Sequence, residues 1–151
     1  EMEYKHEGTF DWRTSRYQSY TRLFVPEGSH LLKTEVVDAT GKVTQSPTAE
    51  SGKELGREWF GIFVVIEPGQ TKKLRFVYEV SPQVAAQIQK KSYTLMVHKQ
   101  AGTIAHGLTL TLNFGTSITR ATPKETATNT KDETYEFNGD LREDREFKIN
   151  F

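Results

Sequence analysis

The sequence predicts an all-β fold, an antiparallel sandwich of about eight or nine strands with one short helix. Apolar residues recur at every second position through most of the chain, which is the period of a half-buried strand. Gly- and Pro-containing turns separate these stretches at fairly regular intervals, as at residues 26–29 and 67–70. Two long, uneven polar stretches, residues 38–53 and 115–131, suit crossings between two sheets better than the uniform hairpins of a barrel. The whole chain, residues 1–151, is expected to form one domain.

The first strands are expected at residues 19–25 and 31–37, and Phe10 and Trp12 are expected to begin the sheet. Apolar and polar side chains alternate in both strands, and the Pro-Glu-Gly-Ser sequence between them favours a tight turn. We therefore expect these two strands to pair as antiparallel neighbours. Residues 41–53 carry one sizeable apolar side chain and are interpreted as an exposed loop or an irregular edge strand.

The most apolar stretch, residues 55–66, predicts a central strand covered on both faces, with Trp59 in the core. The Glu-Pro-Gly-Gln sequence that follows places Pro and Gly where a β-turn favours them. Residues 72–80 alternate cleanly, so we expect these two strands to form a hairpin. A short helix is expected at residues 82–90, because Ser81 can cap it and Pro suits its first position.

The remaining strands are expected at residues 93–99 and 108–114, around Tyr135 and Phe137, and in the alternating residues at the C-terminal end. A Thr-rich polar stretch lies between the second and third of these strands and is interpreted as a long connection. Residues 138–140 have the Asn-Gly-Asp sequence of a turn.

The charge and the cysteine content exclude several function classes. The chain has 20 basic and 20 acidic residues and no cysteine. Nucleic-acid-binding domains normally carry a basic excess on one face, so we expect no nucleic-acid partner. The lack of cysteine removes thiol catalysis, thiolate metal ligands and disulfides. No apolar run reaches the ~18–20 residues of a membrane span, and the chain begins at Glu1 rather than Met. We therefore interpret it as a segment of a longer protein or as a processed product, and we expect membrane contact only through a segment outside this chain.

Residues that could catalyse a reaction or bind a metal do not form a complete set. His98 and His106 lie on neighbouring expected strands, but a third metal ligand near them is missing. No Gly-x-Ser-x-Gly nucleophile motif and no Gly-rich phosphate loop is present. Four carboxylates alternate with apolar residues and are expected mostly to face solvent rather than a cleft: Glu54, Glu58, Glu67 and Glu79. We therefore expect no enzyme activity, no metal and no cofactor.

One group of side chains is a candidate ligand-binding site. Trp12 and Tyr17 flank Arg13 and Arg16 in a polar stretch. Exposed aromatic rings beside cationic side chains are suited to stacking on a ligand, such as a carbohydrate. The alternative is that these rings pack over the open end of the sandwich.

Four stretches of the sequence carry a family resemblance. They are YQSYTRLFVPEGS (residues 17–29), WFGIFVVIEPGQ (59–70), LRFVY (74–78) and YTLMVHKQAGT (93–103). In this order they resemble the C-terminal β-region of bacterial proteins in domain-of-unknown-function family 4012, and residues 141–151 resemble the final strand of that region. The fourth stretch departs from the family pattern by having His98 in place of Gln and Ala101 in place of Pro.

The resemblance covers nearly the whole chain, roughly residues 16–151. It implies a bacterial cell-envelope protein that is tethered to the membrane through a distant N-terminal segment, with this domain outside the cytoplasm. It brings no catalytic residues with it.

Three functions remain open on these observations. The leading hypothesis is a non-catalytic, immunoglobulin-like module of a bacterial envelope protein, which serves in adhesion, assembly or spacing and meets a protein or a cell-wall glycan. The alternative is a carbohydrate-binding module that uses Trp12 and Tyr17. The third hypothesis is a hydrolase domain, which would need two buried carboxylates in one cleft.

Overall fold

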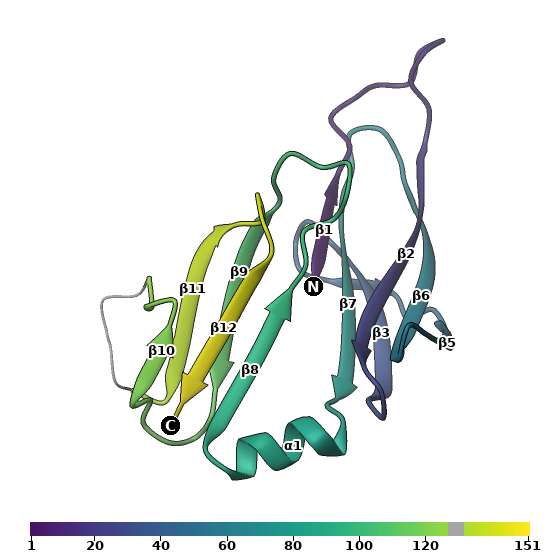
Figure 1. The fold of residues 1–151 in the computed structure, drawn as a ribbon. Coiled ribbons are helices and arrows are strands. Elements are labelled where there is room, and N and C mark those ends of the chain that lie inside the picture. Colours follow the sequence, from purple (N-terminus) through teal and green to yellow (C-terminus); the bar gives the residue numbers. More distant parts are fainter. Residues whose placement is uncertain (127–131) are drawn as a thin grey trace. The chain divides into compact units, whose positions relative to one another are not determined.

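A computed structural model describes residues 1–126 and 132–151 of the chain, and it confirms the all-β class. Within these residues there are twelve strands, all paired antiparallel, and one short helix. The described residues divide into two compact units, unit 1 (Glu1–Pro82) and unit 2 (Gln83–Phe151) (Figure 1). The assignment of residues 1–151 to one domain stays a prediction.

Unit 1 is a sandwich of two sheets. One sheet has the spatial order β1 (Met2–Lys5), β7 (Thr71–Glu79), β3 (His30–Asp38) and β4 (Val43–Gln45), and the other has the order β2 (Tyr17–Pro26), β6 (Arg57–Ile66) and β5 (Glu50–Glu54). Val36 from β3, Leu74 from β7 and Ile62 from β6 form one buried cluster, and each is at most 3% exposed. Because this cluster draws on both sheets, the inner faces of the two sheets pack against each other.

Both hairpins expected in this part of the chain are wrong. β2 pairs with β6 along its whole length, whereas β3 pairs with β7. The turns at residues 26–29 and 67–70 therefore carry the chain from one sheet to the other. Each turn closes with a backbone hydrogen bond, from Ser29 N to Pro26 O (3.2 Å) and from Gln70 N to Glu67 O (3.0 Å). Alternation shows which face a side chain takes, but it does not show which strand lies next to it.

The polar stretch before β6 contains two edge strands, as one of the two interpretations expected. β4 pairs with the end of β3, and β5 pairs with β6 as a hairpin. The β5–β6 turn has Leu55 at φ 54° and Gly56 at φ 68°. Two positive φ angles in a two-residue loop are typical of a type I′ turn, which matches the twist of the two strands.

The expected start of the sheet at Phe10 and Trp12 is wrong. β1 begins earlier, at Met2, and Phe10 and Trp12 lie in the loop between β1 and β2. Short apolar–polar alternation is a weak signal, and the adjacent Asp11 folds this stretch into a turn instead. Its Oδ1 accepts hydrogen bonds from the backbone N–H groups of Arg13 and Thr14, both at 2.7 Å.

Unit 2 is a second, smaller sandwich. One sheet has the order β10 (Arg120–Thr122), β12 (Arg145–Asn150) and β8 (Ser92–Val97), and the other pairs β11 (Thr134–Asp140) with β9 (Gly107–Asn113). Phe147 of β12 is fully buried between the sheets. Its ring contacts Phe137 and Tyr135 of β11 edge-on, with ring centroids 5.0 and 6.2 Å apart.

Two expectations for unit 2 need revision. The Asn-Gly-Asp turn expected at residues 138–140 is wrong, because these residues continue β11 and pair with β9 as far as Gly107. The long connection expected at residues 115–130 contains the short strand β10. Residues 127–130 of that stretch lie outside the described residues. The expected helix is confirmed as α1 (Pro82–Gln89), which follows β7 along the chain (Figure 1).

Candidate functional site

The outer face of the β2–β6–β5 sheet carries a group of exposed aromatic side chains. Tyr20 of β2 lies opposite Phe63 of β6, and Phe24 of β2 lies opposite Trp59 of β6. The exposed fractions are 41% for Tyr20, 42% for Phe24 and 58% for Phe63, whereas Trp59 is half-buried. We call these four residues, together with Arg22 between them, the aromatic face.

Two glycines allow these rings to lie directly against the sheet backbone. A Cβ at Gly61 would lie 2.8 Å from Cζ of Tyr20 and 3.0 Å from Cζ3 of Trp59, and a Cβ at Gly52 would lie 2.7 Å from Cζ2 of Trp59. Any larger residue at these positions would push a ring away from the sheet. The sequence contains this signal, because both glycines interrupt strands on the register that faces outward.

The expectation that Trp59 lies in the core is wrong. The core side of β6 is taken by Phe60, Ile62, Val64 and Ile66, which alternate with Trp59 along the strand. The whole stretch is apolar on both registers, so its composition does not distinguish the buried register from the exposed one.

Charged side chains are interspersed with the rings. The Cζ atom of Arg22 lies 4.7 Å from the Trp59 ring centroid and 5.5 Å from that of Tyr20, and its Nη1 lies 3.2 Å from Oε2 of Glu54. The Tyr20 hydroxyl donates a 2.5 Å hydrogen bond to Oε2 of Glu50, and this bond raises the pKa of Tyr20 above its ordinary value. Arg22 and Tyr20 are therefore held in place by β5 as well as by β6.

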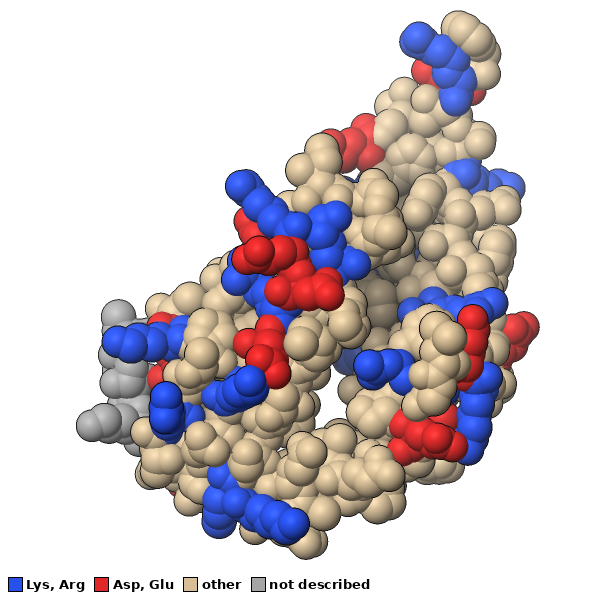
Figure 2. Space-filling model, in the orientation of Figure 1, with Lys and Arg blue, Asp and Glu red and all other residues tan. Residues whose placement is uncertain are grey.

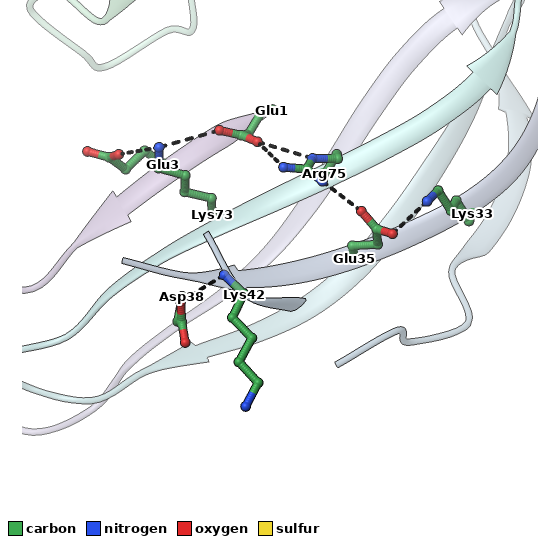
Figure 3. A network of polar contacts seen from close by, with 8 residues as sticks. All are labelled: Glu1, Glu3, Lys33, Glu35, Asp38, Lys42, Lys73 and Arg75. Carbon is green, nitrogen blue, oxygen red and sulfur yellow. Dashed lines mark hydrogen bonds and ion pairs between the residues drawn. The ribbon is translucent and has the colours of Figure 1, made fainter. Parts of the chain in front are cut away.

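The outer face of the opposite sheet of unit 1 has a different character. There, charged side chains of β1, β7 and β3 form a continuous ion-pair network (Figure 3). Oε1 of Glu35 lies 2.7 Å from Nζ of Lys33, and Oε2 of Glu35 lies 2.9 Å from Nη1 of Arg75. Nη2 of Arg75 lies 3.1 Å from Oε2 of Glu1. The hydrogen bond from Lys33, with a further one from Arg75, lowers the pKa of Glu35. Because these charges satisfy one another, this face offers fewer groups to a partner than the aromatic face does.

The four site residues that the sequence singles out have different contact partners in the structure. Trp12 is 89% exposed in the β1–β2 loop, and Arg13 stacks on it with Cζ 5.0 Å from the ring centroid. Arg16 instead pairs with Glu67, with Nε 2.7 Å from Oε1. Tyr17 begins β2, where its ring centroid lies 6.3 Å from that of Tyr4. In the described part of the chain, no ring contact joins Trp12 to Tyr17.

The histidines do not converge on a metal-binding site. Nδ1 of His98 lies 2.9 Å from Oδ2 of Asp144, and Oδ1 of Asp144 accepts a 2.8 Å hydrogen bond from the backbone of Lys99. The hydrogen bond with His98 lowers the pKa of Asp144 the most, and the bond from the Lys99 backbone lowers it further. Within residues 1–126 and 132–151, no three His, Asp or Glu side chains lie close enough together to hold a metal ion.

A pocket of about 380 Å³ lies in unit 1. It is lined partly by His30, Lys53, Glu58 and Phe60. Glu58 lies 3.8 Å from Nζ of Lys53, which also contacts Glu27 at 2.8 Å. The Glu58 carboxylate in this pocket is thus paired with a cation. Glycoside hydrolysis needs a second carboxylate facing the first across the cleft.

Charge over the molecular surface is mixed. Figure 2 shows several clusters in which Lys and Arg lie next to Asp and Glu, separated by wide areas of other residues on the face drawn, and the net charge is zero. Comparisons of this chain with models of protein families, with curated proteins and with solved structures found no match. In the described ranges, no helix has both the length and the apolar character that crossing a membrane requires.

Proposed function

We propose that this chain is a non-catalytic recognition module of a bacterial cell-envelope protein, and that the aromatic face is the surface that meets its partner. The observation that carries the proposal is the set of four aromatic rings gathered on one solvent-exposed sheet face, two of them lying against glycine backbone. Contiguous exposed apolar patches on soluble domains mark interaction sites more often than scattered apolar residues do.

The composition and the rigidity of this face both favour binding. Trp, Tyr and Arg are the residues that dominate the binding energy of protein interfaces, and all three occur here within two adjacent strands. The contacts of Arg22 with Trp59 and Glu54 hold the side chains before any partner arrives. A surface that is already ordered loses less conformational entropy on binding, so more of its contact energy contributes to affinity.

A cell-wall glycan is the second candidate partner, and one observation favours it. Hydrogen-bonding groups alternate with the rings, because Tyr20 and Glu50 form one pair and Arg22 and Glu54 another. Sugars present an apolar face to an aromatic ring and hydroxyl groups to neighbouring carboxylates and guanidinium groups. The aromatic face is thus a second candidate place for carbohydrate binding, and the site at Trp12 and Tyr17 stays a prediction.

The placement in the cell envelope, outside the cytoplasm, rests on the family resemblance of the four sequence stretches. This placement favours an immunoglobulin-like module that serves in adhesion, assembly or spacing. The proposal of a non-catalytic module is supported by the pocket of unit 1, which is lined by one carboxylate, Glu58, with Nζ of Lys53 3.8 Å from it.

Co-sedimentation with purified bacterial peptidoglycan, together with a glycan array, tests the glycan candidate. We expect binding by the wild-type chain, loss in the variant Tyr20→Ser/Phe63→Ser, and retention in the control Leu32→Ser. Leu32 is 54% exposed on β3, so the control removes a comparable apolar side chain elsewhere in unit 1. Binding that survives the double variant would place the glycan site elsewhere.

A photo-crosslinking amino acid at position 63, expressed in the native bacterium, tests the recognition surface for protein partners. We expect a discrete crosslinked product from position 63 and none from position 32. A turnover screen with glycans, esters and phosphoesters completes the test, because robust turnover would contradict the proposal of a non-catalytic module.

A further inference from the structure

β2 is an edge strand whose outer side has no partner. It lies at the end of the β2–β6–β5 order, and all ten of its residues pair with β6 without a bulge. In an antiparallel strand, the N–H and C=O groups of every second residue point away from the paired neighbour. Within residues 1–126 and 132–151, no backbone hydrogen bond reaches residues 17–25 from that side.

The other edges of unit 1 are protected in the usual ways. β1 has four residues that include Glu3 and Lys5, β4 has three residues, and β5 has five with charges at Glu50, Lys53 and Glu54. Short length and charge both discourage edge-to-edge pairing. β2 instead has ten residues, one charged side chain, Arg22, and a proline only at its last position.

We infer that β2 pairs antiparallel with β2 of a second copy of this chain, about a two-fold axis at Thr21. The inward-facing residues of β2 have odd numbers and the outward-facing ones have even numbers. Thr21 then lies opposite Thr21 of the second copy, and Tyr17 lies opposite Val25. This register overlaps the full strand, and Thr–Thr pairs are among those that stabilise antiparallel sheets.

Charge selects this register over its neighbours. With the axis at Thr21, each Arg22 lies opposite Tyr20 of the second copy, which repeats between chains the contact that Arg22 makes with Tyr20 inside each chain. Moving the axis to Arg22 would set two arginines directly opposite each other, which is unfavourable. Moving it to Tyr20 would leave the end of each β2 unpaired.

The pairing extends the aromatic face. A two-fold axis perpendicular to the sheet keeps the outer faces of both copies on the same side. The product is a six-stranded sheet in the order β5-β6-β2-β2-β6-β5, with two aromatic faces side by side. A repetitive partner could then engage both faces at once, which raises the overall affinity without any new contact. The dimer does not depend on the proposed function, because it rests on the strand edge alone.

Sedimentation equilibrium of the full chain measures the dimer. We expect a reversible dimer for the wild type and weakening of about tenfold or more for Tyr20→Lys, which sets a lysine opposite Arg22 twice. The double variant Tyr20→Lys/Arg22→Glu places opposite charges across the axis and should restore the dimer. Phe63→Lys is the matched control, because Phe63 lies on the same face but on β6, away from the axis.

A distance measurement determines the register independently of these substitutions. The chain has no cysteine, so Gln18→Cys, at an exposed position, allows one spin label per chain. The axis at Thr21 separates the two labelled positions by six residues along paired strands, or about 20 Å. An axis at Arg22 predicts about 27 Å, and one at Tyr20 about 14 Å. A chain that stays monomeric up to millimolar concentration, or a dimer with any other separation, would overturn the inference.

Discussion

The guanidinium carbon of Arg22 lies 4.7 Å from the centroid of the Trp59 ring, and the same ring packs against the backbone of Gly52. Three adjacent strands thus meet at one side chain, because Arg22 belongs to β2, Trp59 to β6 and Gly52 to β5. A tryptophan placed outside the core is ordered here by contacts within its own sheet. The rings of the aromatic face are therefore held in place by contacts within the chain itself.

Adding a methyl group at Gly61 should displace the rings that lie on it. A Cβ there would meet Tyr20 at 2.8 Å and Trp59 at 3.0 Å, so we expect Gly61→Ala to lower the free energy of unfolding by about 1–3 kcal/mol. Urea denaturation measures the loss, and near-ultraviolet circular dichroism reports the changed ring environment. Gly107→Ala is the matched control, because a Cβ on that strand glycine would meet no atom within 4 Å. Equal losses in the two variants would contradict the contact.

Removing the Phe147 ring should destabilise unit 2. This ring is fully buried against Phe137 and Tyr135, and we expect Phe147→Ala to cost about 3–5 kcal/mol. Hydrogen exchange of β8 and β12 measures the effect, because local opening there should become much more frequent. Exchange in these strands that matches the wild type would show that the ring does not hold the two sheets of unit 2 together.

Glu35 should make the stability of the chain sensitive to acid. Its pKa is lowered in the folded chain by Lys33 and Arg75, so its contribution is present above the unfolded pKa of about 4.3 and disappears as the pH falls through the folded pKa. We therefore expect the difference in unfolding free energy between wild type and Glu35→Gln to shrink as the pH falls below about 4. A difference that stays constant over this pH range would contradict the lowered pKa of Glu35.

Tyr135 should remain protonated in alkaline solution. Burial, with a smaller effect of the nearby Glu125 carboxylate, raises its pKa to about 12. Because the unfolded chain loses this proton near pH 10, the stabilisation is complete below that pH and is lost as the pH rises toward 12. We expect the phenolate absorbance of wild type minus Tyr135→Phe to rise with a midpoint near pH 12. A difference that titrates near pH 10 instead, as an exposed tyrosine does, would contradict the burial of this group.

The same residue has a structural role at neutral pH. The Tyr135 hydroxyl donates a 3.0 Å hydrogen bond to the carbonyl of Pro123. Tyr135→Phe should therefore lose about 1 kcal/mol of stability. Its stability should then vary less with pH above pH 10 than that of the wild type.

The sequence predicts the positions and faces of many strands well. Leu108, Leu110 and Leu112 alternate with polar residues, and the structure places them on the inner side of β9. The short helix after Ser81 is also confirmed. These features depend on local propensity and on the alternation of apolar and polar residues, and both can be read directly from the amino-acid sequence.

Strand partners and the candidate site could not be predicted in the same way. The turns after Pro26 and Pro68 have hairpin residues, yet they join different sheets, because the choice depends on packing in the whole of unit 1. The sequence predicts Trp59 in the core, because both registers of β6 are apolar. The glycines at 52 and 61 were the available signal that this register carries rings on the outside.

The fluorescence of Trp59 tests the central claim most directly, namely that the aromatic face is the recognition surface. The chain has two tryptophans, so Trp12→Phe leaves Trp59 as the one reporter, positioned on the face itself. Titration with soluble peptidoglycan fragments, or with the protein captured by crosslinking at position 63, should shift its emission in a saturable way. The shift should disappear in the Tyr20→Ser/Phe63→Ser background. Calorimetric binding of either partner with unchanged Trp59 emission would contradict the account.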